Sequence, residues 1–334
     1  MSGGGKLGFD ALNTALKAAG EETRLRVLAL LAEAELTVSD LTDILRQSQP
    51  RISRHLKLLV EAGLVERFRE GTWAFFRLAE HGAGADVAQA LIERLDPGDQ
   101  TVKRDHERLA SVRQARATAA QAYFRAHAAE WDRIRKLHVA DAAVEDAIRA
   151  ALSDKPFRSL LDLGTGTGRM LEMFGPDIER GLGLDLSLDM LLLARDRLER
   201  AGLRNCSVRQ GDIYDLPLAN DSFDVVILHQ VLHFLDDGAR AIREAARVLR
   251  PGGRLLVVDF APHEQEFLRE QFAHRRLGFA SETVTQWITA SGLDPVMHKS
   301  LAPEPGSEGK IAVSLWLARD TRALMATPLR REVA

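Results

Sequence analysis

Apolar residues recur at helical spacing over residues 9–35, with an interruption at Gly20. The next stretch, TVSDLTDIL, predicts a second helix with Ser39 as its N-cap. After the short turn RQSQ, a third helix is predicted, in which Pro50 suits the first turn and Gly63 marks the end. The segment LVERFREGTWAFFRL then predicts two strands around the turn EGT, and DVAQALIERL predicts a further amphipathic helix.

This order of elements predicts an α+β winged helix-turn-helix domain over residues 1–95. On the third helix, Ile52, Leu56, Leu59 and Val60 share one apolar face, and basic residues point away from it. Such a polar, positive face suits the major groove of DNA. The candidate DNA contacts of this helix and of the hairpin are Ser48, Gln49, Arg51, Ser53, Arg54, His55, Lys57, Arg67, Arg69 and Thr72.

A turn-rich segment, DPGDQ, follows at residues 96–100. Residues 101–151 contain neither Gly nor Pro and are rich in Ala, Arg and Glu, so they predict a helical connector over residues 96–155. Its aromatic part includes Tyr123, Phe124 and Trp131. Two interpretations stay open, a lid over a cofactor pocket and packing between domains.

From residue 158 onward, apolar runs of strand length alternate with helical patterns. This alternation predicts a mostly parallel sheet covered by helices on both faces, an α/β domain over residues 156–320 with a tail at 321–334. The predicted strands are SLLDLG, RGLGLDLS, CSVRQGD, FDVVILH, RLLVVDF and IAVSLWLA.

Glycines and acids lie at the ends of the first three of these strands. The stretch LDLGTGTGR places three glycines between a strand and a helix, where backbone can approach a ligand closely. Arg169 stands where the dinucleotide-binding pattern G-x-G-x-x-G needs its last glycine, so that pattern is not matched. Asp185 ends the second strand, where a carboxylate suits ribose hydroxyls, and Asp212 ends the third.

The motifs LDLGTGTGR, GLDLSLDML, GDIYDLP, FDVVILHQVLHFLDD and ARVLRPGGRLLVVDF together resemble class I S-adenosylmethionine-dependent methyltransferases over about residues 157–318. The resemblance implies a Rossmann-like fold with a seven-stranded sheet and S-adenosylmethionine as cofactor. It implies Asp185 at the ribose, Asp212 and Ile213 at the adenine, and His229 at the methionine part. The full implied set is Asp162, Gly164, Gly166, Gly168, Asp185, Leu186, Asp212, Ile213 and His229.

The stretch QSQPRISRHLKLLVEAGLVERFREGTWAFFRL resembles the winged-helix repressors of the ArsR family over roughly residues 9–95, with Phe76 where the family often has tyrosine. The resemblance implies an operator in double-stranded DNA and a homodimer formed through residues near 9–19 and 84–95. Many members sense metals through cysteine pairs. This domain has no cysteine, so metal sensing by that route is not expected and no metal ligand is assigned; a site of histidine and carboxylates that includes His81 stays open as the alternative.

The whole chain has 334 residues, a formal net charge of −3 and one cysteine, Cys206. Any nucleic-acid surface must therefore be a local patch, and a single cysteine excludes a disulfide framework and fits a reducing cytoplasm. The N-terminus lacks the apolar core of a signal peptide, and no apolar run approaches the roughly 20 residues needed to cross a bilayer. We expect a cytoplasmic protein without a membrane partner.

The methyl acceptor is the least defined element. LHQVLHFLDD lacks the Asn/Asp-Pro-Pro-Tyr motif of DNA amino-methyltransferases, so a small-molecule acceptor is favoured. No catalytic residue is assigned; the candidate bases are His229, His233, His263 and His274. Two interpretations of Arg269, Arg275 and Arg276 stay open, binding of an acidic substrate and solvated side chains, and the second is favoured. The alternative function is a non-catalytic repressor that senses S-adenosylmethionine or S-adenosylhomocysteine.

Overall fold

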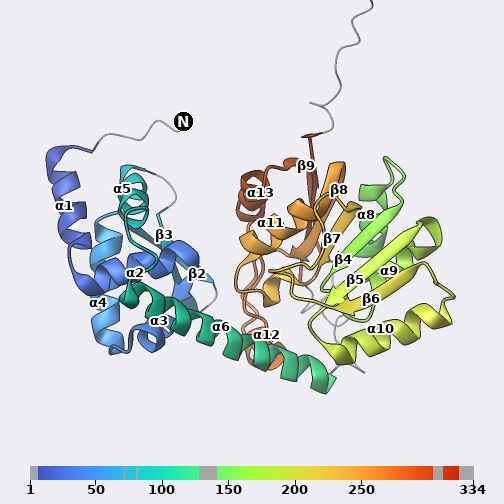
Figure 1. Ribbon diagram of the computed structural model, residues 1–334, viewed down its shortest axis with the longest axis horizontal. Coiled ribbons are helices and arrows are strands. Elements are labelled where there is room, and N and C mark those ends of the chain that lie inside the picture. The colour runs from blue at the N-terminus through green and yellow to red at the C-terminus, as the bar shows by residue number, and fades with distance from the viewer. Residues whose placement is uncertain (1–6, 71, 80–81, 128–140, 304–310, 323–334) are drawn as a thin grey trace, which may run out of the picture. The chain divides into compact units, whose positions relative to one another are not determined.

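The computed structural model describes residues 7–70, 72–79, 82–127, 141–303 and 311–322 (Figure 1). The chain divides into two compact units, Met1–Thr118 and Ala119–Ala334. The predicted boundary at residues 95–96 does not coincide with this division, because the first part of the predicted connector belongs to the first unit. The second predicted boundary, at 155–156, falls inside the second unit.

The first unit is a helical domain with a three-stranded sheet of order β1-β3-β2. β2 and β3 form the predicted hairpin, in which Phe68 lies opposite Phe75. Its elements are α1 (Phe9–Ala19), α2 (Glu22–Glu33), β1 (Leu36–Thr37), α3 (Val38–Leu45), α4 (Gln49–Glu61), β2 (Val65–Glu70), β3 (Trp73–Leu78), α5 (Ala83–Ile92) and the first part of α6 (Gln100–His127).

Local chemistry determines where these helices begin and end. The predicted N-cap of α3 at Ser39 is wrong, because Thr37 accepts the backbone N–H of Asp40 while the Asp40 carboxylate accepts the N–H of Thr37. This reciprocal capping box satisfies two backbone donors that Ser39 would leave unpaired. α4 ends at Glu61, as expected, and Gly63 follows with a φ of 68°, which favours glycine.

The second unit contains a seven-stranded sheet of order β6-β5-β4-β7-β8-β10-β9. β10 runs antiparallel to β8 and β9, and the remaining neighbours are parallel. The elements are α8 (Asp141–Leu152), β4 (Ser159–Leu163), α9 (Arg169–Phe174), η2 (Gly175–Asp177), β5 (Arg180–Asp185), α10 (Leu188–Arg200), β6 (Cys206–Gln210), β7 (Phe223–His229), η3 (Leu232–Phe234), α11 (Gly238–Val248), β8 (Leu249–Phe260), α12 (Phe267–Phe272), α13 (Ser281–Ala290), β9 (Asp294–Leu301) and β10 (Val313–Arg319).

Helices cover both faces of this sheet, as the alternating pattern predicts (Figure 1). Residues of α8, α9, α10 and α12 pack with the strands in one core. Residues of α11 and α13 pack with the strands in the other. The fold is therefore a Rossmann-like α/β domain, in which ligands bind at the carboxyl ends of the parallel strands. Among the described residues, no helix combines the length and apolar character needed to cross a bilayer.

Candidate functional site

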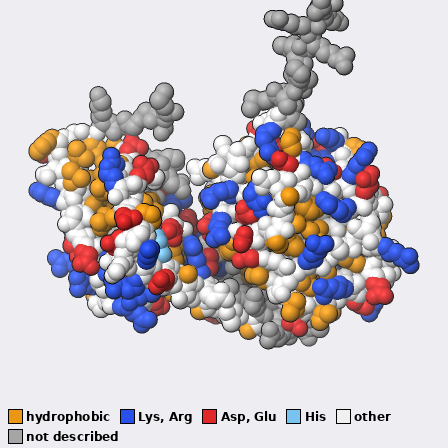
Figure 2. Space-filling view, in the orientation of Figure 1, with side chains coloured by type: hydrophobic (Ala, Val, Ile, Leu, Met, Phe, Trp, Pro, Cys, Tyr) orange, Lys and Arg blue, Asp and Glu red, His pale blue; other side chains and the backbone are white. Residues whose placement is uncertain are grey.

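The predicted DNA contacts of α4 divide into exposed and buried side chains. Ile52, Leu56 and Leu59 are buried in the core of the first unit, so the opposite face of α4 is exposed. That exposed face carries six of the predicted contacts, Ser48, Gln49, Arg51, Ser53, Arg54 and Lys57. Figure 2 shows Lys and Arg side chains gathered over the lower part of this unit, where Figure 1 draws α3 and α4.

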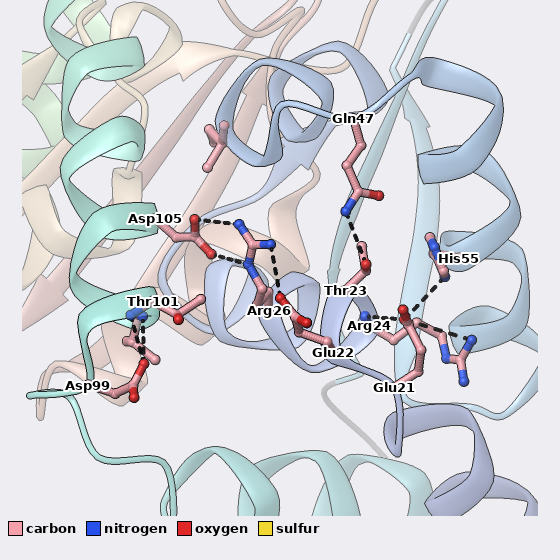
Figure 3. A network of polar contacts seen from close by, with 12 residues as sticks. Glu21, Glu22, Thr23, Arg24, Arg26, Gln47, His55, Asp99, Thr101 and Asp105 are labelled. Atoms are coloured by element: carbon pink, nitrogen blue, oxygen red, sulfur yellow. Dashed lines mark hydrogen bonds and ion pairs between the residues drawn. The ribbon is translucent and has the colours of Figure 1, made fainter.

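His55 is different, because it is only 9% exposed. Its Nδ1 lies 3.5 Å from Oε2 of Glu21, which precedes α2 (Figure 3). Burial lowers the pKa of His55; the Glu21 carboxylate opposes this shift, and Arg24, Arg51 and Arg54 add to it. The buried imidazole faces Glu21 at the start of α2 and is therefore not part of the exposed face of α4.

The hairpin presents its predicted contacts to solvent. Arg67, Arg69 and Thr72 are all exposed. Between them the aromatic rings of Phe68 and Phe75 stack across the two strands with centroids 5.6 Å apart. The exposed Arg46, in the turn before α4, extends the basic surface and was not among the predicted contacts. Its φ of 55° places it in the left-handed region, which sequence periodicity does not reveal.

The beginning of α6 is bound to the first unit by buried polar contacts. The Arg26 guanidinium donates Nε and Nη2 to the two carboxylate oxygens of Asp105, at 2.6 and 2.8 Å. Asp105 is 3% exposed, and hydrogen bonding to it raises the pKa of Arg26. Further along α6, Arg116 pairs with Asp40. The α6 residues up to Thr118 are therefore part of the winged-helix unit.

Figure 3 shows that the start of α2 contacts three different segments. Glu21 faces His55 of α4, Thr23 accepts a hydrogen bond of 3.1 Å from Gln47 in the turn before α4, and Arg26 binds Asp105 of α6. Less than two helical turns separate these contacts, so the start of α2 joins α4 to α6.

In the second unit, the glycine-rich loop lies at the carboxyl end of β4. Gly164, Gly166 and Gly168 all have positive φ, a conformation that L side chains rarely adopt. A Cβ on Gly164 would lie 2.4 Å from Cγ2 of Val231, so the loop packs against the segment that follows β7. Asp162 is buried and accepts a 2.6 Å hydrogen bond from the Thr165 hydroxyl, which stabilises the loop from within.

Asp185 ends β5 beside this loop. Its two carboxylate oxygens accept one backbone N–H each, from Gly166 at 2.9 Å and Ser187 at 2.8 Å. Burial raises the pKa of Asp185, although these backbone bonds partly oppose the shift. Each oxygen has a second lone pair, so the carboxylate can accept two more hydrogen bonds, as a ribose diol requires. The loop and Asp185 thus fit an adenosyl cofactor.

The other predicted cofactor residues are distributed along the same edge. Leu186 follows Asp185 and is 38% exposed, which leaves apolar surface open to a ligand. Asp212 is exposed and accepts the Tyr214 backbone N–H, while the neighbouring Ile213 is buried. His229 ends β7 and is half-buried. All predicted cofactor residues therefore lie at or near the carboxyl ends of β4, β5, β6 and β7.

Beyond β4, the same edge carries a buried histidine–aspartate pair. His233 Nδ1 lies 2.8 Å from Oδ1 of Asp259, and both residues are almost fully buried. Strand pairing explains the contact, because His229 of β7 lies opposite Val258 of β8. Of the four predicted candidate bases, His233 and His274 are brought together, with ring centroids 4.2 Å apart.

The prediction that Arg269, Arg275 and Arg276 are solvated is wrong. Arg269 pairs with Glu266 at 3.1 Å and its side chain is 4% exposed. Arg275 pairs with Asp236. Arg276 is buried, and this burial lowers its pKa to about 10. Backbone N–H groups of Arg275 and Arg276 both donate to the His233 carbonyl, so this segment covers the histidine.

In comparisons with known proteins, each of the two units matches a family model. The model of the arsR family of bacterial regulatory proteins matches residues 21–67, and a methyltransferase-domain model matches residues 161–257. The demethylmenaquinone methyltransferase of Thermobifida fusca is 30% identical over 165 residues, which cover 47% of this chain and 68% of that protein. The chain belongs to the methyltransferase family. Its first unit carries an ArsR-family helix-turn-helix, which implies DNA binding.

A second curated relative and one solved structure are also similar to the chain. The methyltransferase YcgJ of Bacillus subtilis is 34% identical over 115 residues, 34% of this chain and 46% of YcgJ. A structure of a complex between the Haloferax volcanii Trm112 methyltransferase activator and a methyltransferase matches 60% of this chain and 97% of that chain, with 22% identity and a TM-score of 0.51, which shows the fold. The chain spans less than half the length of several curated relatives that it matches.

The methyltransferase domain also contains site residues that the sequence did not indicate. A class I domain of this kind implies a cofactor of the S-adenosylmethionine type. Gly183 of β5 leaves space for the loop, since a Cβ there would lie 2.6 Å from Oγ1 of Thr165. Asp259 binds His233 from 26 residues away, and only strand pairing brings the two together. Two of the aromatic residues of the predicted connector, Tyr123 and Phe124, belong to α6. Trp131 lies outside the described residues. The prediction that these residues form a lid over the cofactor pocket therefore stays a prediction.

Proposed function

We propose that the chain is a DNA-binding transcriptional regulator whose second unit methylates a small molecule with S-adenosylmethionine, and that cofactor occupancy alters operator affinity. One observation carries this proposal. α6 begins on the winged-helix unit, where Asp105 binds Arg26, and continues as one helix past Thr118 into the residues of the second unit. A conformational change in either unit can therefore act on the same helix.

The exposed face of α4 is the surface we assign to the major groove. Arg51 and Arg54 suit guanine edges or phosphates, and Lys57 suits a phosphate. His55 is excluded from direct contact by its burial and positions α4 through Glu21. The full set of proposed contacts is Ser48, Gln49, Arg51, Ser53, Arg54 and Lys57 on α4, with Arg67, Arg69 and Thr72 on the hairpin.

The carboxyl edge of β4, β5, β6 and β7 is the proposed cofactor site. S-adenosylmethionine supplies a methyl group on a sulfonium sulfur. Asp185 would accept the ribose hydroxyls, and Asp212 and Ile213 would flank the adenine. His229 would lie near the methionine part. Gly164, Gly166 and Gly168 keep the loop free of side chains, and Asp162 stabilises it through Thr165. Leu186 completes the proposed set beside Asp185.

A homodimer is the proposed state on DNA. Phe9, Leu12 and Leu16 are spaced by three and four residues, so they lie on one face of α1, and they are 84%, 38% and 48% exposed. An exposed apolar stripe of this kind favours packing against a second copy. Two winged helices related by a two-fold axis would then contact two half-sites of one operator.

A small molecule is the proposed methyl acceptor. The relative from Thermobifida fusca is named for demethylmenaquinone, which supports an acceptor of small-molecule size. The Asp259–His233 pair supports catalysis over a purely sensory role, because a buried imidazole oriented by a carboxylate suits proton transfer. In the alternative, the domain only senses S-adenosylmethionine or S-adenosylhomocysteine.

Operator binding by the full chain tests the proposal. The operator is selected from random DNA, and its affinity is measured by fluorescence anisotropy at fixed salt, because salt alone changes such affinities strongly. We expect a change of about fivefold or more on addition of either ligand, which corresponds to about 1 kcal/mol of coupling. Asp185→Asn serves as the control that should bind the operator without responding. An unchanged affinity, with both ligands bound, would refute the coupling.

A further inference from the structure

The carboxyl edge of the sheet has two halves with different chemistry. β4, β5 and β6 carry the glycine-rich loop and the acids of the proposed cofactor site. β7 and β8 lie on the other side of β4 in the strand order. Gln230 and His233 follow β7, and Asp259 lies near the carboxyl end of β8. Val231 packs directly against Gly164 of the loop, so the two halves adjoin.

Asp259 fixes the protonation pattern of His233. The buried carboxylate lies 2.8 Å from His233 Nδ1 and also accepts the backbone N–H of Phe260 at 2.7 Å. A carboxylate accepts hydrogen bonds only, so Nδ1 of the neutral imidazole carries the proton. Nε2 then has the free lone pair, which is the form that can remove a proton from a ligand. The same carboxylate stabilises the imidazolium that this transfer produces.

Aromatic rings surround the His233 imidazole. The centroid of Phe234 lies 4.0 Å from it, that of His274 4.2 Å and that of Phe260 4.8 Å. Such surroundings disfavour a charged amine, which would lose its hydration, and favour a neutral, apolar acceptor. A ring-shaped acceptor can extend the same packing by edge or offset contacts.

Gln230 supplies an independent indication of a ligand at this edge. It is 9% exposed, and its Nε2 is buried without a hydrogen-bond partner among the described residues. Its φ of 51° is unusual for a residue other than glycine. Unpaired buried donors and such backbone conformations are costly and concentrate at functional sites. An oxygen atom of a ligand would satisfy the Gln230 amide.

We propose that this edge binds a phenol-type methyl acceptor, with His233 as the base that removes its hydroxyl proton and Gln230 as a donor to an acceptor oxygen. The inference rests on the proposed function and specifies its substrate class. The acceptor oxygen forms a bond to the methyl carbon, the carbon–sulfur bond breaks with its electron pair passing to sulfur, and the hydroxyl proton passes to Nε2. A phenol, with a pKa near 10, gives up its proton to imidazole far more readily than an aliphatic alcohol.

The first test uses methyl transfer by the full chain to catechol and 2-naphthol, with 2-phenylethylamine and cyclohexanol as contrasting acceptors. We expect O-methyl products from the phenols only. His233→Asn is the informative variant, because the Asn amide nitrogen can still donate to Asp259 while Nε2 is lost. We expect at least a 100-fold fall in kcat, with S-adenosylmethionine affinity within about twofold of the parent. His298→Asn, which alters an exposed histidine of β9 packed on Trp316, should leave kcat unchanged.

Asp259 is a positioning residue, so its test needs a pH profile. In Asp259→Asn the imidazolium loses its stabilising carboxylate, and the acid limb of the pH–rate profile should move to lower pH. Gln230→Leu should raise KM for the phenol at least fivefold and change kcat less. A merely structural role for Asp259 would leave the position of the acid limb unchanged, which would refute its assignment.

Imidazole ¹⁵N spectra of the full chain provide a readout that does not need turnover. We expect the Nδ1–H tautomer for His233, its loss in Asp259→Asn, and a shift of the Nε2 resonance when 2-naphthol is added with S-adenosylhomocysteine. If the cofactor binds but neither phenol moves this resonance or gains a methyl group on oxygen, the inference is overturned and the proposed function stands. If the cofactor itself does not bind, the proposed function fails.

Discussion

Arg26 of α2 and Asp105 of α6 form a two-point ion pair whose donor–acceptor distances are 2.6 and 2.8 Å. The pair joins α2 to α6, whose residues from Ala119 onward belong to the second unit, and Asp105 is 3% exposed. A buried pair of this kind stabilises one particular docking of α6, because a shifted helix would leave a charge without its partner.

Asp105→Ala should release the start of α6 from α2. Removing one member of a buried pair costs about 3 kcal/mol, and the loss should appear as faster hydrogen exchange of the α2 and α6 amides in the full chain. Glu61→Ala is the matched control, since the Lys57–Glu61 pair is exposed and 3.8 Å apart and contributes under about 1 kcal/mol. Equal effects of the two substitutions would contradict this role.

The same substitution tests the coupling between units. Asp105→Ala should leave cofactor affinity unchanged and operator affinity without ligand within about threefold of the parent. The response of the operator to S-adenosylmethionine should be lost, because α6 no longer transmits a change to α2. Anisotropy titrations with and without the ligand measure both quantities. A full response in the variant would show that α6 does not carry the signal.

Arg54→Ala should weaken operator binding strongly. Arg54 is exposed on the face of α4 that we propose for the major groove, and loss of a bidentate base contact costs about 1–3 kcal/mol, or roughly tenfold to a hundredfold in affinity. Arg104→Ala removes an exposed charge from α6 and serves as the control, with an expected change below about threefold. If both substitutions weaken binding equally, net charge and not groove contact determines the affinity.

His55 should make the stability of the first unit depend on pH. Burial lowers its pKa in the folded chain below the ordinary value of about 6.5, so the unfolded chain binds the proton more readily. Stability is therefore fully present above pH 6.5 and falls as pH decreases toward the lowered pKa. Hydrogen exchange of α4 at pH 7.5 and 5.5, corrected for intrinsic rates, measures this. The His55→Gln variant should lose less stability than the parent over the same interval; an equal loss would refute it.

Sequence patterns revealed the elements and most exposed contacts, but not every buried partner. Ile52, His55, Leu56 and Leu59 follow one helical face, so the burial of His55 was implicit in the spacing. The neighbouring basic residues Arg54 and Lys57 nevertheless favoured the prediction that His55 is an exposed DNA contact. β9 was not among the predicted strands because exposed polar residues dominate it, including Lys299 and Ser300. An edge strand next to β10 needs no continuous apolar run.

The site was predictable where glycines and acids follow strands directly. Gly164 and Asp185 are of this kind, because parallel strands bring their carboxyl ends to one edge. Asp259 and His233 are not, since their contact depends on the register between β7 and β8. The unpaired Gln230 amide depends on a backbone conformation that no periodic pattern reveals.

Asp185 should make cofactor affinity sensitive to acid. Burial raises its pKa above the ordinary value of about 3.9, so protonation removes the ribose acceptor at a higher pH than for an exposed aspartate. Calorimetry should show the affinity for S-adenosylmethionine falling as pH decreases from 7. Without ligand, the contribution of Asp185 to folding stability instead increases as pH decreases. The reason is that its raised pKa makes the folded chain bind the proton more readily than the unfolded chain. Asp185→Asn should lower affinity roughly tenfold to a hundredfold and remove most of the pH dependence.

Gly183→Ala should damage the cofactor site without removing any proposed cofactor contact. The new Cβ would lie 2.6 Å from Oγ1 and 2.8 Å from Cβ of Thr165, so the loop and its hydrogen bond to Asp162 must shift. Overpacking of this size costs about 1–3 kcal/mol, and we expect at least a fivefold loss of S-adenosylmethionine affinity by calorimetry.

Gly181→Ala is the control on the same strand. Its Cβ would lie 2.7 Å from Sγ of Cys206, on the same face of β5 as Gly183 but two residues earlier, and so farther from the glycine-rich loop at the carboxyl end of the sheet. It should therefore lower the thermal midpoint of the domain by a similar amount and leave cofactor affinity within about twofold. Equal losses of affinity in the two variants would mean that general destabilisation, and not displacement of the glycine-rich loop, weakens binding. A loss of cofactor affinity in Gly183→Ala alone would show that the absence of a side chain at Gly183 allows the glycine-rich loop to adopt its binding conformation.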